Sequence, residues 1–178
     1  MILNEKTLHQ LYGVIFIGIL IAAILYGTTY QQYKHFDLND TRGVGDVHGY
    51  IKMADGDFGV DPSHRYRPLV PWLAGVISSA FEYSASMHST NIGLSFYIVN
   101  FLFSLAAGIF LFYFLINITG SILLSFIGLM FFLGSRHTII ACATPITDSF
   151  YLCSIAAFAW LVVTKRVLWL ALCIPLMV

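Results

Sequence analysis

The longest uncharged run in the chain covers residues 83–135, which contain no Asp, Glu, Lys or Arg. A helix needs about 20 predominantly apolar residues to cross a bilayer, so this run is long enough for two such helices. Charged residues make up only 10% of the 178-residue chain, whereas roughly 25% is usual in a soluble domain. The sequence therefore predicts an integral membrane protein and excludes a soluble domain.

Most of the charged side chains are concentrated in one segment, between Lys34 and Arg67. The nine Lys and Arg of the chain balance nine Asp and Glu, and the chain contains no basic cluster of the kind that binds nucleic-acid phosphates. We therefore expect the lipid bilayer as a partner and no nucleic acid. The charged segment itself is predicted to be a polar loop between membrane helices.

The apolar runs predict an all-α, polytopic membrane protein with four to five transmembrane helices. Residues 68–82 follow the i, i+3, i+4, i+7 rhythm of an amphipathic helix. Because this segment is too short to span the membrane, we expect an interfacial helix. The first loop is external and carries short surface helices. The predicted spans are residues 11–30, 92–115, 121–135 and 145–163, a fifth begins at 167–178, and the polar loop covers 31–67.

Positive charges beside the spans predict the orientation of the chain. Lys6 and the pair Lys165 and Arg166 fall on the same side when residues 68–82 do not span. The positive-inside rule places that side in the cytoplasm. The N-terminus is then cytoplasmic and the first loop extracytoplasmic, so any chemistry of the loop is expected at the external face.

Asp46 precedes residues 47–54, in which apolar side chains recur at helical spacing. Two interpretations of Asp46 stay open. Either it caps this short helix, because an Asp side chain accepts hydrogen bonds from the first free N–H groups, or it is a general base that takes a proton from an incoming hydroxyl. Tyr50 follows four residues later and is expected to lie beside it.

Arg65 and Arg67 stand directly before the predicted interfacial helix, which begins at Pro68. The start of a helix favours an anion, and guanidinium groups bind phosphate. The two arginines are therefore predicted either to hold a phosphate group or to attract anionic lipid in general. Asp148 is expected in the first turn of the span at 145–163, where an acid is favourable for the helix dipole.

No pattern in the chain indicates a metal or a reactive thiol. The three cysteines show no C-x-x-C spacing and lie in apolar surroundings, so they are expected to pack as small apolar residues. The segment from Asp55 to Tyr66 departs from an EF-hand calcium loop at its sixth and twelfth positions. We expect neither a metal ion nor a cofactor.

Asp46, Tyr50 and Ala54 form the pattern Asp-x-x-x-Tyr-x-x-x-Ala, which the run YRPLVPWLA follows at residues 66–74. Together they resemble the first external loop of the GT-C superfamily, polytopic glycosyltransferases that include protein mannosyltransferases and bacterial lipid-sugar transferases. The run TPITD at residues 144–148 is similar to a Pro-x-Thr-Glu segment that opens a later helix in several such enzymes, with Asp148 in place of Glu.

The resemblance implies a membrane glycosyltransferase that moves a sugar from a polyprenyl-phosphate carrier to an acceptor at the extracytoplasmic face. It implies that Asp46 acts as base or orients the acceptor, and that Arg65 or Arg67 holds the carrier phosphate. Tyr50 and Asp148 are counted among the substrate-binding residues.

GT-C enzymes usually have more spans and a soluble domain after them. The chain is therefore expected to be either the N-terminal portion of a longer enzyme or a short relative that acts as a subunit. The alternative function is a non-catalytic integral subunit of a larger membrane protein complex, with other membrane subunits as partners.

Overall fold

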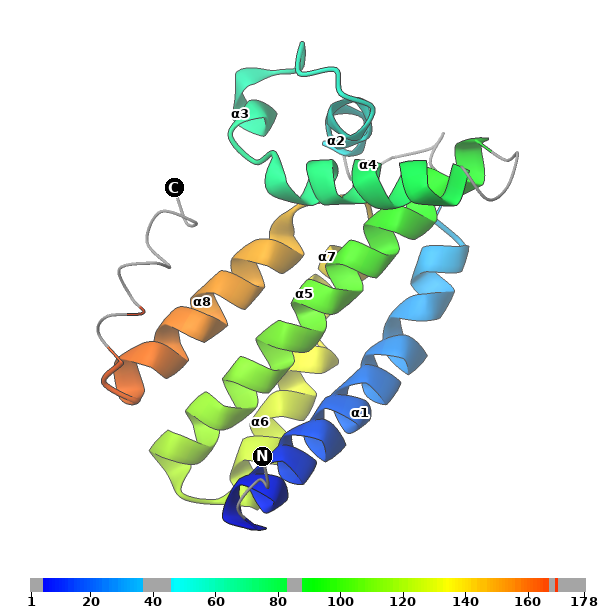
Figure 1. Cartoon of the computed structure of the whole chain (residues 1–178). Helices are drawn as coiled ribbons and strands as arrows, with labels where there is room; N and C mark the ends of the chain where they lie inside the picture. Colours follow the sequence, from blue (N-terminus) through cyan, green and yellow to red (C-terminus); the bar gives the residue numbers. More distant parts are fainter. Residues whose placement is uncertain (1–4, 37–45, 83–87, 167–168, 170–178) are drawn as a thin grey trace.

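The structure, a computed structural model, describes residues 5–36, 46–82, 88–166 and 169 (Figure 1). Every regular element within these residues is an α-helix, so the predicted all-α class is confirmed. Long helices form a bundle, and three shorter helices cover one of its ends. We call the covering part, residues 46–82, the end layer.

In the part of the chain that the structure describes, the bundle contains four successive helical rods, each a long helix or a bent helix pair, and neighbours along the chain run in opposite directions (Figure 1). α5 lies between the others and packs against α1, α6, α7 and α8 as well as α4 of the end layer. The turn between α5 and α6 contains Gly120 at a φ of +64°, in the left-handed region that favours glycine. The rods are α1 (Glu5–Lys34), α5 (His88–Thr119), the bent pair α6 (Ile122–Leu133) and α7 (Arg136–Ala143), and α8 (Asp148–Val163).

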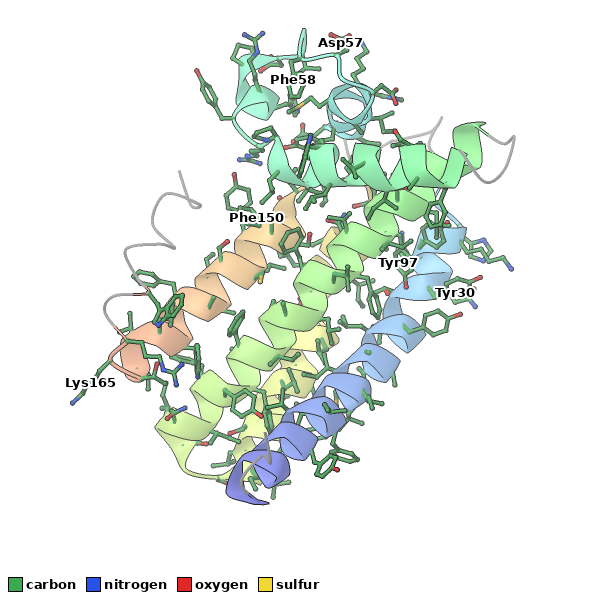
Figure 2. The ribbon with its side chains drawn as sticks, viewed as in Figure 1. Tyr30, Asp57, Phe58, Tyr97, Phe150 and Lys165 are labelled. Carbon is green, nitrogen blue, oxygen red and sulfur yellow. The ribbon has the colours of Figure 1, made fainter. Side chains whose placement is uncertain are left out.

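The charged loop and the positive charges after α8 lie at opposite ends of the bundle. Figure 2 shows Asp57 in the end layer and Lys165 at the far end of α8. α1 begins at the same end of the bundle as the end of α8 (Figure 1). This is the arrangement of the two ends on which the predicted membrane orientation depends.

The end layer consists of α2 (Val47–Ala54), α3 (Pro62–Arg65) and α4 (Leu69–Glu82). α4 lies across the ends of the bundle helices, and α2 packs on its outer side (Figure 1). The carbonyl of Pro68 accepts a hydrogen bond of 2.8 Å from the N–H of Trp72, so this helix begins within one residue of the predicted start. Its 14 residues extend for about 21 Å.

The prediction of four to five transmembrane helices exceeds what the structure supports. Among the described residues, two helices are long and apolar enough to cross a membrane, Tyr12–Lys34 and Ile92–Thr119, and a third is counted if α6 and α7 form one bent span. α8 has 16 residues, which extend for about 24 Å, whereas the hydrocarbon core is about 30 Å thick. The predicted start of a fifth span at 167–178 lies, apart from Trp169, outside the described residues.

A break after the predicted third span produces a helix that the sequence analysis did not anticipate. α6 ends at Leu133, and α7 leaves it at an angle of 59°. Ser135 Oγ accepts a hydrogen bond of 3.2 Å from the N–H of Thr138 and so caps the start of α7. The third span of residues 121–135 is therefore corrected to a 12-residue helix followed by a bend.

Buried apolar side chains form two clusters, of which one joins the end layer to the bundle. The first cluster lies between α1, α5 and α6 and contains Ile21, Leu25, Phe112, Leu129 and Leu133. The second contains Val47, Tyr50, Met53, Val60, Val70 and Ala74 of the end layer together with Phe96, Val99, Ala141 and Ile146 of the bundle. Because the end layer shares this core, the bundle sets the positions of its side chains.

Asn100, fully buried in α5, ties α5 to the connection between α7 and α8. Its Nδ2 donates to the carbonyl of Thr144 at 2.8 Å, and its Oδ1 accepts from the Ser149 hydroxyl. Buried polar groups need partners, because an unpaired one keeps its full desolvation cost. These hydrogen bonds therefore hold the first turn of α8 in place beneath the end layer.

Replacing Asn100 with Leu is expected to lower the free energy of unfolding by about 1–3 kcal/mol. The change removes the acceptor of the buried Ser149 hydroxyl and one of the hydrogen bonds to the Thr144 carbonyl. Thermal unfolding of the detergent-solubilised protein measures it. The control is Asn117→Leu, because Asn117 is exposed and donates only within its own helix, to the Tyr113 carbonyl; equal effects of both substitutions would contradict the prediction.

Candidate functional site

Asp46 lies at the N-cap position of α2, but its side chain makes no capping hydrogen bond to the described residues. Its Oδ1 lies instead 3.0 Å from Nε2 of His64, which α3 supplies. The oxygen is off the direction of the ring N–H, so this contact has the distance of an ion pair without the alignment of a hydrogen bond. Asp46 thus occupies the predicted N-cap position, but its side chain does not make the predicted capping hydrogen bond within the described residues.

Tyr50 is the buried centre of the site. One helical turn after Asp46, its ring is only 1% exposed and meets the His64 ring edge-on, with the centroids 5.1 Å apart. Its hydroxyl lies 3.4 Å from both Arg67 Nη1 and Thr147 Oγ1. A single side chain of α2 therefore contacts α3, the connection between α3 and α4, and the N-cap residue of α8.

Arg67 lies in the connection between α3 and α4 and contacts the hydroxyl end of Tyr50. Its guanidinium lies over the Tyr151 ring, 5.2 Å from the centroid. Partial burial lowers the pKa of Arg67, but the hydrogen bond that it donates to the Tyr50 hydroxyl and the nearby groups of Tyr151 and Asp148 outweigh this effect, and the pKa is raised overall. Arg67 is therefore a permanent cation whose N–H donors are only partly used.

Asp148 opens α8, as predicted, and lies near enough to Arg67 to raise the pKa of the guanidinium. Thr147 precedes it and donates to the Tyr50 hydroxyl. Pro145 lies buried just before these residues, where its ring cannot continue α7. The connection between α7 and α8 thus delivers one carboxylate and one hydroxyl to the underside of the end layer.

Four of the five residues singled out by the sequence therefore meet in one place. Asp46, Tyr50, Arg67 and Asp148, together with His64, form what we call the loop site. Arg65 does not join them, because its Nη2 donates to the carbonyl of Val60 at 3.2 Å. Its contact within the described residues closes the turn between α2 and α3.

Two glycines allow α2 to pack closely on its neighbours. A Cβ atom on Gly75 of α4 would stand 2.3 Å from the backbone oxygen of Ala54, the last residue of α2. A Cβ on Gly49 would stand 3.3 Å from the His64 ring. The close approach at Gly75 fixes the end of α2 on α4 and with it the height of Tyr50 above the bundle.

Sequence reasoning gave no role to His64 or Tyr151. His64 is in the run that contains both arginines, and its separation from Asp46 in sequence offers no periodic signal. Tyr151 follows Asp148 by three residues, which places both on one face of α8. That spacing is the signal from which Tyr151 could have been found.

The chemistry available at the loop site is that of proton transfer and anion binding. A carboxylate with a histidine neighbour can accept a proton, and a guanidinium with free N–H donors can bind an oxyanion. No group of three or more His, Cys, Asp or Glu side chains suited to a metal ion occurs among the described residues. We compared the chain with protein-family models, curated proteins and solved structures, and none of them matches it.

Proposed function

We propose that this protein is a GT-C-like membrane glycosyltransferase, or the part of one that carries its first loop. It transfers a sugar from a polyprenyl-phosphate carrier to an acceptor. The observation that carries this proposal is that Asp46 and Arg67 are linked through the buried Tyr50: Asp46 contacts His64, whose ring meets that of Tyr50, and Arg67 donates to the Tyr50 hydroxyl. One side of the site then supplies a base, and the other supplies a cation for a phosphate.

In the proposed reaction, the acceptor hydroxyl attacks the anomeric carbon of the carrier-bound sugar. A new C–O bond forms, the bond between the sugar and the phosphate oxygen breaks, and the phosphate leaves with its electron pair. Asp46 takes the hydroxyl proton, while Arg67 stabilises the charge that develops on the leaving phosphate. Asp148 and Tyr151 orient the guanidinium from below.

The exposed apolar side chains of α4 support a lipid-linked donor. Trp72 and Val76, one turn apart, are 56% and 51% exposed. Such a face suits the interface of a bilayer, and it begins five residues after Arg67. A prenyl chain held in the membrane along α4 would therefore place its phosphate near the guanidinium.

The orientation of the protein is part of the same proposal. Lys165 and Arg166 follow α8 at the end opposite to the loop site. By the positive-inside rule, that end faces the cytoplasm. The loop site then faces the extracytoplasmic side, where polyprenyl-linked donors would meet the acceptor.

The two nearby arginines provide a test of phosphate binding. Arg67→Gln is expected to weaken the binding of a synthetic polyprenyl phosphate about 10-fold or more, because a charge-assisted hydrogen bond contributes roughly 1.5–3 kcal/mol. Arg65→Gln removes the same charge from a side chain that is bonded to the Val60 carbonyl. It is expected to change the affinity little.

Isothermal titration of the detergent-solubilised protein measures both affinities. The proposal is contradicted if the two substitutions weaken binding equally, since generic attraction to an anionic lipid would then explain it. Binding that is unchanged in both variants, together with no sugar transfer by the unmodified protein, would support the non-catalytic subunit instead.

A further inference from the structure

We propose, building on the transferase function above, that His64 is a positioning residue for Asp46. It holds Oδ1 of the carboxylate and leaves the other oxygen to receive the proton of the acceptor. The pair then works as one unit, in which the imidazole fixes the orientation of the carboxylate that accepts the proton. None of the sequence patterns assigns this role to His64.

The geometry of the pair separates a fixed partner from an accessible one. The side chain of His64 is 15% exposed, that of Asp46 is 59% exposed, and Nε2 lies 3.0 Å from Oδ1. His64 is thus packed within the protein, whereas an acceptor can reach the Asp46 carboxylate. This asymmetry is what a base and its positioning residue require.

The imidazole ring is held from three directions. Tyr50 meets it edge-on at an interplanar angle of 79°. Gly49 approaches its face so closely that a Cβ there would stand 3.3 Å from the ring. Ser63 Oγ lies 3.4 Å from Nδ1 on the remaining side. A ring fixed in this way keeps Nε2 close to Asp46 Oδ1.

Nε2 of His64 is buried but has no aligned hydrogen-bond partner among the described residues. A buried polar nitrogen in this state is costly, and in a purely structural histidine it would be satisfied. Here the nearest polar atom is the carboxylate oxygen of Asp46. A small rotation of the exposed Asp46 side chain would align the contact, as catalytic hydrogen bonds often tighten only when substrate binds.

Three other titratable or charged groups lie near this pair. Tyr50 lies against the ring, and its hydroxyl accepts a hydrogen bond from Arg67. Asp61, at the start of α3, accepts hydrogen bonds from the side chain and backbone of Ser63, which lower its pKa, and the charge of His64 lowers it further.

The first test needs no substrate. In the detergent-solubilised protein with ¹⁵N-labelled histidine, the His64 signals are identified by their loss in His64→Gln. Asp46→Asn is expected to shift the Nε2 signal of His64 at a fixed pH, because Asp46 Oδ1 is the polar atom that lies 3.0 Å from Nε2. Asp57→Asn is the matched control, since Asp57 is an exposed acid whose carboxylate bonds the Gly59 N–H. An Nε2 signal that responds equally to the two substitutions overturns the proposed pairing.

The second test measures the kcat of sugar transfer. His64→Gln keeps a neutral N–H donor at this position, so it is expected to retain most of the turnover. His64→Ala is expected to lower kcat about 10-fold or more with little change in the KM for the donor. A kcat of His64→Gln as low as that of His64→Ala, or an unchanged kcat in His64→Ala, overturns the role of His64.

The two tests distinguish the two proposals. Transfer by the unmodified protein, combined with a His64 Nε2 signal that does not respond to Asp46→Asn, overturns only the positioning role. Absence of transfer overturns the transferase function, and the positioning role of His64 in it, whatever the His64 signal shows.

Discussion

Replacing Asp46 with Asn is expected to lower the kcat of sugar transfer by roughly 10²–10⁴-fold, because an amide cannot take a proton from the acceptor. Asn has nearly the same shape as Asp, and the Asp46 side chain makes no capping hydrogen bond to the described residues. The fold and the donor site at Arg67 are therefore expected to persist. Initial rates with a labelled polyprenyl-phosphate sugar, measured in liposomes, give kcat and the KM for the donor.

The control for this prediction is Asp57→Asn in the same loop. It removes the same charge from an exposed position, where the carboxylate accepts only a local hydrogen bond from the N–H of Gly59. Its rate is expected to match that of the unmodified protein. Turnover that is unchanged in Asp46→Asn would remove Asp46 from the mechanism.

Gly75→Ala is expected to destabilise the protein by about 1–3 kcal/mol, the usual cost of overpacking a well-packed contact. The new methyl group would stand 2.3 Å from the carbonyl oxygen of Ala54. Because that atom belongs to the backbone, α2 must move away from α4. Thermal unfolding in detergent measures the loss of stability, and the rate of transfer should fall as well, since Tyr50 moves with α2.

Gly27→Ala provides the matched comparison. Gly27 also lies within a helix, but a Cβ there would meet nothing within 4 Å. Alanine is the better helix former by roughly 0.5–1 kcal/mol, so this variant is expected to be as stable as the original or slightly more so. A Gly75→Ala protein that unfolds no earlier than Gly27→Ala would show that the close contact with Ala54 does not hold the end layer.

Local signals in the sequence were sufficient to predict several elements of the fold. The rhythm of apolar residues located α2 and α4. Proline and acid placed Asp148 in the first turn of α8. Each of these features depends on residues within one or two helical turns, which is the range over which periodicity and helix-start chemistry act.

The number of spans could not be predicted in the same way. Hydropathy reports whether a residue tolerates an apolar environment, and it does not report whether the helix continues. The hydroxyl of Ser135 accepts a hydrogen bond from the N–H of Thr138, and this cap is enough to start α7 and bend the third rod. Because this cap is a single polar residue in an apolar run, hydropathy does not distinguish it from the rest of the predicted span.

The sequence predicted the composition of the loop site better than its geometry. Asp46, Tyr50 and Arg67 were found from a sequence pattern. The contact between Arg67 and Tyr50, however, follows from how α2 packs on α4. The contact between Asp46 and His64 joins two helices that share no common periodicity. Tertiary packing decides such contacts, so they required the structure.

The shared core of the end layer also dictates an order of assembly during synthesis. The Tyr50 hydroxyl contacts Thr147, which follows it by 97 residues in the chain. A ribosome adding about 5–20 residues per second needs roughly 5–20 s to cover that distance. Throughout this interval the apolar side of α2 lacks Ile146, one of its neighbours in the finished core. The loop site is therefore completed late, after the start of α8 has been synthesised. A chaperone has time to bind the nascent chain before then.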